Sequence, residues 1–178
     1  MTRTLLQSVL LLLFLFAAPE LMAQKRAKRL ADEDTKNWRY EIQCVNVGRQ
    51  GSYLIKVYSF SRKKHIPAEQ SKKNAVHGII FKGIPAGERG CVSQPPLARN
   101  ANVEQEKREY FDDFFAEGGK YMKFVSLTTD GAVAATDRFR VGRNGKEYKI
   151  GVVVTVNIDL LRKELESAGI IRGLSSGF

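Results

Sequence analysis

Polar and apolar residues alternate between residues 40 and 47, where charged and amide side chains separate the apolar positions from Tyr40 to Cys44. Because successive side chains of a strand point to opposite faces, this alternation predicts a half-buried β-strand. Residues 53–60 are rich in aromatic and β-branched types and predict a second strand. Residues 48–51 contain two glycines, so we expect an antiparallel hairpin with its turn at this position.

Two later segments change to helical spacing. Apolar residues between positions 68 and 80 recur at helical intervals, and Gly83 is placed to end that helix. The spacing of Val103 and the aromatic residues up to Phe115 predicts a second helix, which ends at two adjacent glycines. We interpret its aromatic stripe as core packing rather than a ligand site, because it has the spacing of a buried helix face.

The segment between the two predicted helices, residues 83–102, shows no periodicity. It is rich in proline and glycine, including the pair Pro95-Pro96, and predicts a long irregular loop. Long loops inside compact domains are often functional, so this loop is a candidate binding or catalytic segment.

The last third of the chain returns to strand patterns. Residues 121–127, 136–142 and 146–156 each predict a strand. Asn144-Gly145 lies between the last two and predicts a tight hairpin turn, because both residues tolerate the positive φ that such a turn requires. Residues 157–169 predict a closing helix, with an asparagine at its start and a glycine at its end.

In chain order, these elements predict an α+β fold. We expect two layers, in which a mostly antiparallel sheet of about five strands packs against three helices. The expected order is β-β-α-α-β-β-β-α.

The N-terminus adds an export signal to this picture. Arg3 is followed by an unbroken apolar run from Val9 to Ala18 and then by Ala23 at the expected cleavage position. We therefore expect residues 1–23 to be a cleaved signal peptide and the mature chain to be periplasmic. A retained membrane anchor is the alternative. We favour cleavage because the apolar run is short for a spanning helix, which needs about 20 apolar residues.

The remainder of the chain divides into three parts. Residues 24–37 change from basic to acidic with almost nothing apolar, which predicts a flexible charged arm. Residues 38–172 are expected to form a single domain, followed by a tail at 173–178. Removing 23 of 178 residues leaves 155, which is the usual size of one domain.

The formal net charge of the chain is +10. Arg3 and Glu20 cancel within the signal peptide, so the mature chain keeps this charge. Such a charge favours an acidic partner, which we expect to be an envelope protein complex or an anionic envelope polymer. Export argues against nucleic acid as the partner, and we expect the chain to be peripheral to a membrane at most.

The sequence holds two cysteines, Cys44 and Cys91. An oxidising compartment allows an even pair of thiols to form a bridge, so a Cys44–Cys91 disulfide is possible. The alternative is two separately buried thiols, since free cysteine behaves as a small apolar residue.

Patterns of catalytic or metal-binding residues are scarce. His65 and His77 do not have the spacing of zinc ligands, so we predict no metal and no cofactor. Asp112 and Asp113 are adjacent and point to different sides of a helix, unlike an acid/base pair. We therefore name no catalytic residue and favour a chain that is not an enzyme. A cysteine and a histidine that meet in space are the alternative.

The predicted hairpin around Asn144-Gly145 gathers basic residues. A two-residue turn pairs Arg140 with Lys149 and Phe139 with Ile150, so that the core face holds Phe139, Val141, Tyr148 and Ile150. The other face and the turn then hold the candidate residues for partner or anion binding, which are Arg138, Arg140, Arg143, Lys146 and Lys149. Like charges directly opposite each other destabilise a sheet by up to about 1 kcal/mol, which favours an anionic partner. The alternative is a solvated face whose long side chains spread apart.

Four stretches of the chain, residues 53–59, 70–81, 149–157 and 160–165, resemble a known type of envelope module. These are the strand-helix-strand-strand units of flagellar-assembly and lipoprotein families in Gram-negative bacteria. The long Pro/Gly loop and the lack of a lipoprotein cysteine depart from that pattern. The end of the signal, Met-Ala before Gln, resembles Bacteroidota export signals. The resemblance implies a non-catalytic periplasmic component of an envelope machine, such as a subunit of the type IX translocon.

These observations leave two classes of function. The first is a binding or assembly component of a cell-envelope complex that docks through the basic hairpin and the Pro/Gly loop. The second is a small periplasmic hydrolase with a Cys/His site in the loop at 83–102. A protein that binds an envelope polyanion is a further alternative.

Overall fold

The computed structural model describes residues 38–62, 68–141, 145 and 147–173. The strands are β1 (Tyr40–Val47), β2 (Ser52–Ser61), β3 (Val125–Leu127), β4 (Arg138–Val141) and β5 (Glu147–Asn157). The helices are α2 (Ala68–Phe81), α3 (Val103–Glu106), α4 (Arg108–Phe114) and α5 (Ile158–Ser167), with 3₁₀ turns η1 (Lys120–Phe124) and η2 (Ala135–Asp137). The predicted signal peptide (1–23), the predicted arm (24–37) and most of the predicted tail lie outside the described residues.

The sheet is built around β5, which pairs antiparallel with β2, β3 and β4. The strand order is β1-β2-β5-β3. Strands β3 and β4 pair with the same edge of β5, where β4 lies along the N-terminal part of β5 and β3 along its C-terminal part. The β2–β5 register is continuous from Ser52↔Asn157 to Ser61↔Tyr148. The predicted first hairpin is confirmed, with β1 and β2 joined through the glycines near residue 50.

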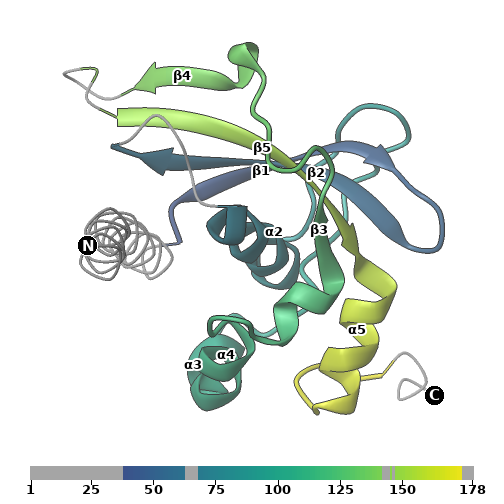
Figure 1. Ribbon diagram of the computed structural model, residues 1–178. Coiled ribbons are helices and arrows are strands. Elements are labelled where there is room, and N and C mark those ends of the chain that lie inside the picture. Colours follow the sequence, from purple (N-terminus) through teal and green to yellow (C-terminus); the bar gives the residue numbers. More distant parts are fainter. Residues whose placement is uncertain (1–37, 63–67, 142–144, 146, 174–178) are drawn as a thin grey trace, which may run out of the picture.

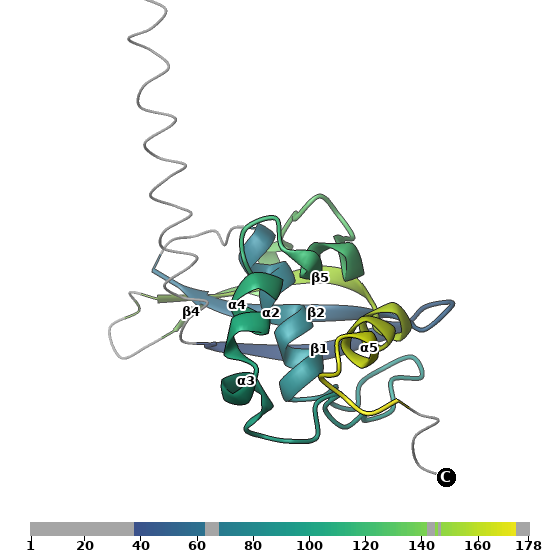
Figure 2. The same ribbon diagram turned by 90° about the horizontal axis from the view of Figure 1, so that it is seen from below.

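The helices of the described residues pack against one face of the sheet, and none of them covers the other face (Figure 1). Figure 2 shows α2, α4 and α5 side by side over the strands. The predicted two-layer α+β fold is therefore confirmed, and its elements follow the predicted order except that the second predicted helix is divided in two. We call the uncovered side of the sheet the outer face.

The core lies between the sheet and the helices, and the alternate, inward-facing residues of the strands form its sheet side. Ile55 and Val57 of β2 and Ile150, Val152 and Val154 of β5 are almost fully buried. The helical half includes Val76 and Ile79 of α2, Phe114 of α4 and Leu161 of α5. The predicted aromatic stripe is core, since Phe111, Phe114 and Phe115 are buried.

Three predicted elements differ from the structure, and one of them is the strand predicted at 136–142, whose first two residues belong to η2 before β4 begins at Arg138. The predicted second helix is divided at Lys107, whose φ of −114° and ψ of 34° are not helical, into α3 and α4. The predicted strand at 121–127 begins instead as η1, and only β3 is extended. The reason is packing: a 3₁₀ turn brings positions i and i+3 to the same side, so both Tyr121 and Phe124 are buried.

The predicted register of the second hairpin is wrong by one residue. Arg140 lies opposite Tyr148, and Phe139 lies opposite Lys149. Because β4 ends at Val141 and β5 begins at Glu147, an odd number of residues separates the strands, whereas the predicted turn required an even number. A shift of one residue moves every side chain to the other face. Arg138 and Arg140 consequently lie on the face opposite to Phe139, Val141 and Lys149.

The disulfide Cys44–Cys91 is present, with a Cα–Cα distance of 5.9 Å, and neither thiol is free. It joins β1 to the irregular loop that follows α2. The loop lies very close to the strand at Gly87, where an added Cβ would be 2.3 Å from the carbonyl oxygen of Cys44. The disulfide and this close approach together hold the loop against β1.

We expect the double substitution Cys44→Ala/Cys91→Ala to lower the free energy of unfolding by about 3–4 kcal/mol. The bridge spans a sequence separation of 47 residues, and removing it restores chain entropy to the unfolded state. Urea denaturation of the oxidised parent and the variant measures the difference. Equal unfolding midpoints and slopes would contradict the expectation.

Candidate functional site

The outer face of the sheet carries charges of both signs that neutralise one another. Three ion pairs lie on this face within the described part of the chain, and they are Arg39–Glu147, Lys56–Asp137 and Lys149–Glu41. In the first pair, both terminal nitrogens of the guanidinium donate to the carboxylate, at 2.7 and 2.8 Å. This face has little unpaired positive charge with which to bind an anion.

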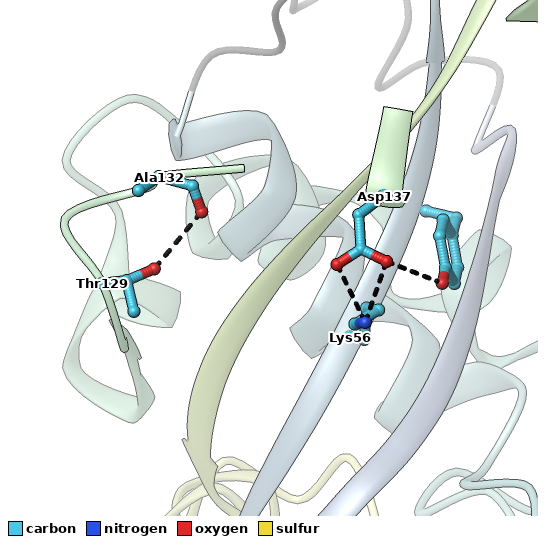
Figure 3. Close-up of polar contacts among 5 residues, drawn as sticks. Lys56, Thr129, Ala132 and Asp137 are labelled. Carbon is cyan, nitrogen blue, oxygen red and sulfur yellow. Dashed lines mark hydrogen bonds and ion pairs between the residues drawn. The ribbon is translucent and has the colours of Figure 1, made fainter. Parts of the chain in front are cut away.

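The most enclosed of these pairs is Lys56–Asp137 (Figure 3). The Lys56 ammonium donates to the Asp137 carboxylate at 2.9 Å, and the Tyr58 hydroxyl donates to the same carboxylate at 3.3 Å. The hydrogen bond to Asp137 raises the pKa of Lys56, and burial raises the pKa of Tyr58. Lys56 is therefore a cation and Tyr58 a neutral donor at neutral pH, so neither of these two side chains is a free base or an activated nucleophile.

The position of Asp137 depends on the connection between β3 and β4. A turn there is closed by the Ala132 N–H donating to the Thr129 carbonyl at 2.7 Å, and the Thr129 hydroxyl donates to the Ala132 carbonyl (Figure 3). On β5, Gly151 leaves room for the cluster, since an added Cβ would be 2.8 Å from the Tyr58 ring and 3.1 Å from the Asp137 Cβ. The cluster thus attaches η2 to the outer face, directly before β4 begins at Arg138.

The basic residues predicted to bind a partner do not form one surface. Lys149 lies on the outer face, bonded to Glu41 and 4.9 Å from the centre of the Tyr58 ring. Arg138 and Arg140 lie on the opposite face, and the Arg140 guanidinium is 5.7 Å from the centre of the Tyr148 ring. Arg143 and Lys146 lie outside the described residues. A role of these residues in binding stays a prediction.

A second polar cluster surrounds His77 beneath α3. The Tyr40 hydroxyl is 2.5 Å from His77 Nδ1, and His77 Nε2 is 3.1 Å from a Glu104 carboxylate oxygen. Because a carboxylate only accepts, Nε2 donates to Glu104 and Nδ1 accepts from Tyr40. The Trp38 ring stacks on the imidazole at a centroid distance of 3.5 Å.

The order of groups in this cluster, hydroxyl to imidazole to carboxylate, is that of a catalytic triad, but its protonation is different. Burial and the Glu104 charge raise the pKa of Tyr40 far above its usual value. Burial lowers the pKa of His77. The hydroxyl is neutral and buried, so it cannot attack a substrate from the surface. The cluster instead ties β1, α2 and α3 together.

A cleft of about 1030 Å³ opens between two segments that are distant in sequence. One wall is the end of the irregular loop and the α3 region, and the other is α5 with the chain that follows it. Its floor is apolar, and its charged lining consists of Arg99, Glu106, Lys107, Arg162 and Arg172. We call this feature the basic cleft.

The four cations of the basic cleft differ from those of the outer face. None of them forms an ion pair with another described residue. The one carboxylate in the lining, Glu106, accepts a hydrogen bond from the Asn100 amide at 3.1 Å. Part of the excess positive charge of the chain is therefore exposed in this cleft.

The sequence did not identify the basic cleft. Its residues come from three separate stretches that share no motif, and their proximity depends on the packing of α5 beside the loop. The only sequence signals were the net charge of +10 and the choice of the loop at 83–102 as a functional candidate.

Comparisons with known proteins give no relative: no family model, no curated protein and no solved structure matches this chain. Within the residues that the structure describes, no helix is long and apolar enough to cross a membrane. The same residues contain no group of three or more His, Cys, Asp or Glu side chains that could hold a metal ion.

We expect Asp137→Ala to lower the free energy of unfolding by about 1–2 kcal/mol, because Lys56 and Tyr58 lose their shared acceptor. Asp112→Ala is the matched control. Its partner Arg108 is 81% exposed, so its loss changes stability by at most about 0.5 kcal/mol. Urea denaturation checks both variants, and equal effects would contradict a structural role of the Asp137 cluster.

We expect the stability of the fold to fall as the pH drops below about 6.5, the usual pKa of histidine. Burial lowers the pKa of His77 in the folded chain, so the unfolded chain binds a proton first and is favoured by acid. His77→Gln removes this titration. The urea midpoint between pH 7.5 and pH 5 should fall for the parent and change less for the variant. Identical pH profiles would show that His77 does not contribute.

Proposed function

We propose that this chain is an exported, non-catalytic binding or assembly component of a cell-envelope complex, which docks on its partner through the free edge of β4. A subunit of a protein secretion machine, such as the type IX translocon, is one form of this proposal. The observation that carries it is the unpaired, exposed edge of the second hairpin.

Export is supported by two independent features. Residues 1–23 have the order of a signal peptide, and the chain contains a disulfide between its two cysteines. Disulfides form and persist in oxidising compartments such as the bacterial periplasm and are rare in the cytosol. Together these features favour a periplasmic location.

A non-catalytic role is supported by the state of the reactive side chains. Cys44 and Cys91 are bonded to each other, which leaves no thiolate for a cysteine hydrolase. His77 is 3% exposed and is engaged on both ring nitrogens. The Cys/His hydrolase that the sequence left open would require both groups to be released.

The edge of β4 has the properties of a strand-docking surface. Within the described residues β4 pairs only with β5, so its other edge is unpaired. Phe139 is 45% exposed, and Arg138 and Arg140 point to the opposite face. An extended partner segment could add a strand here. Acidic residues at alternate positions would face the arginines, and apolar residues between them would lie beside Phe139.

Cross-linking in envelope fractions, followed by recovery of tagged protein, tests this docking surface. We expect the parent to recover one stoichiometric partner and Arg138→Glu/Arg140→Glu to recover at least about tenfold less, because each reversal removes a charge-assisted contact and adds repulsion. The matched control is Arg162→Glu/Arg172→Glu, which changes the net charge equally at the other end of the molecule.

Three results would overturn the proposal. The first is recovery of the parent without a partner. The second is equal loss of the partner in the hairpin variant and its control, which would indicate charge alone. The third is hydrolytic activity that disappears on thiol alkylation, which would require a free cysteine and favour an enzyme.

A further inference from the structure

The walls of the basic cleft are fixed before any ligand binds. The N–H groups of Leu97 and Ala98 donate to the carbonyls of Ile79 and Ile80 in α2, at 3.3 and 2.9 Å. On the facing wall, the Ile170 N–H donates to the Leu165 carbonyl at 2.9 Å. A site whose backbone is already held in place loses little conformational entropy on binding.

The lining of the cleft selects for negative charge. Four cations, Arg99, Lys107, Arg162 and Arg172, and one carboxylate, Glu106, give the lining a net charge of +3. Three of the cations are guanidinium groups, whose planar fork of N–H donors matches carboxylate and phosphate oxygens. Repulsion among these unpaired cations is relieved when a polyanion enters.

The amount of charge favours phosphate over a single carboxylate. A phosphate monoester carries about −1.5 to −2 charges and three acceptor oxygens at neutral pH. Two such groups therefore match the +3 lining, whereas one carboxylate leaves most of it unpaired. The floor offers Leu97, Val103 and Ile170 to an uncharged part of the ligand.

We propose that the basic cleft binds a small ligand that carries two or more phosphate groups. A soluble diphosphorylated compound and a lipid headgroup that carries two phosphates share this chemistry. The cleft is large enough for such a ligand, since small-molecule sites usually enclose about 300–1,000 Å³. This binding site is separate from the β4 edge, because the second hairpin and the C-terminal end of α5 lie at opposite ends of the molecule (Figures 1 and 2).

Titration calorimetry of the full, oxidised mature chain with pyrophosphate and inorganic phosphate tests the proposal. We expect saturable binding of pyrophosphate, weaker binding of phosphate, and a loss of affinity as salt is raised. Arg162→Glu/Arg172→Glu should weaken pyrophosphate binding at least about tenfold. The matched control is Arg138→Glu/Arg140→Glu, which carries the same charge change on the second hairpin and should bind within about twofold of the parent.

A milder pair, Arg99→Gln/Lys107→Gln, repeats the test if the reversal variant loses its fold by near-ultraviolet circular dichroism. Co-sedimentation with phosphatidylcholine vesicles that contain cardiolipin, a lipid with two phosphates, distinguishes the sources. Vesicle binding that the cleft variants lose and the hairpin variant keeps supports the proposal with a lipid headgroup as the ligand. Saturable pyrophosphate binding without vesicle binding supports it with a soluble ligand.

Absence of saturable binding to any of these probes would overturn the proposal. Equal weakening in the cleft and hairpin variants would also overturn it, because binding would then depend on net charge alone. Neither result bears on docking at β4. That proposal is tested by recovery of a protein partner, in which the hairpin pair is the test variant and the cleft pair is the control.

Discussion

The antiparallel pairing of β2 with β5 is the interaction on which the remaining structure depends. It runs without a break from Ser52↔Asn157 to Ser61↔Tyr148 and places β5 where β3 and β4 also pair with it. On one side of this pair, Ile55, Val57 and the facing β5 residues form the base of the core under α2. On the other side, Lys56 and Tyr58 hold Asp137. Loss of this pairing would disrupt the core and the outer face together, and it would separate the first hairpin from the second.

The accuracy of the sequence predictions followed the range of the interactions involved. Alternation located β1, because half-burial of a strand depends on one face meeting a core. Aromatic and β-branched composition located β2, and the strand pattern of residues 146–156 located β5. Asn157 was recognised as a helix cap from local chemistry, and its side chain accepts from the Leu160 N–H at 3.0 Å. The Cys44–Cys91 disulfide was one of two possibilities that the sequence left open, and the structure shows the bonded one.

The predictions were wrong where one residue of register or one distant contact decides the outcome. Asn144-Gly145 predicted that a hairpin joins the two strands, which is confirmed, but the number of residues between β4 and β5 set another register and reversed the faces of Arg138 and Arg140. The basic cleft has no sequence pattern, because Arg99 and Arg172 come together only through the packing of α5 beside the loop. The charge distribution follows from the same packing: carboxylates form ion pairs with the cations of the outer face, while the cations of the cleft form no ion pair with a described residue.

Gly151 gives the outer face a constraint that reaches beyond stability. Any larger side chain there would overlap the Tyr58 ring, and its position in the middle of β5 leaves the backbone no freedom to move aside. Tyr58, Asp137 and Gly151 should therefore change together or not at all during divergence. In distant relatives whose sequences no longer align, a tyrosine, an aspartate and a glycine at these three places in the strand order would together indicate common descent.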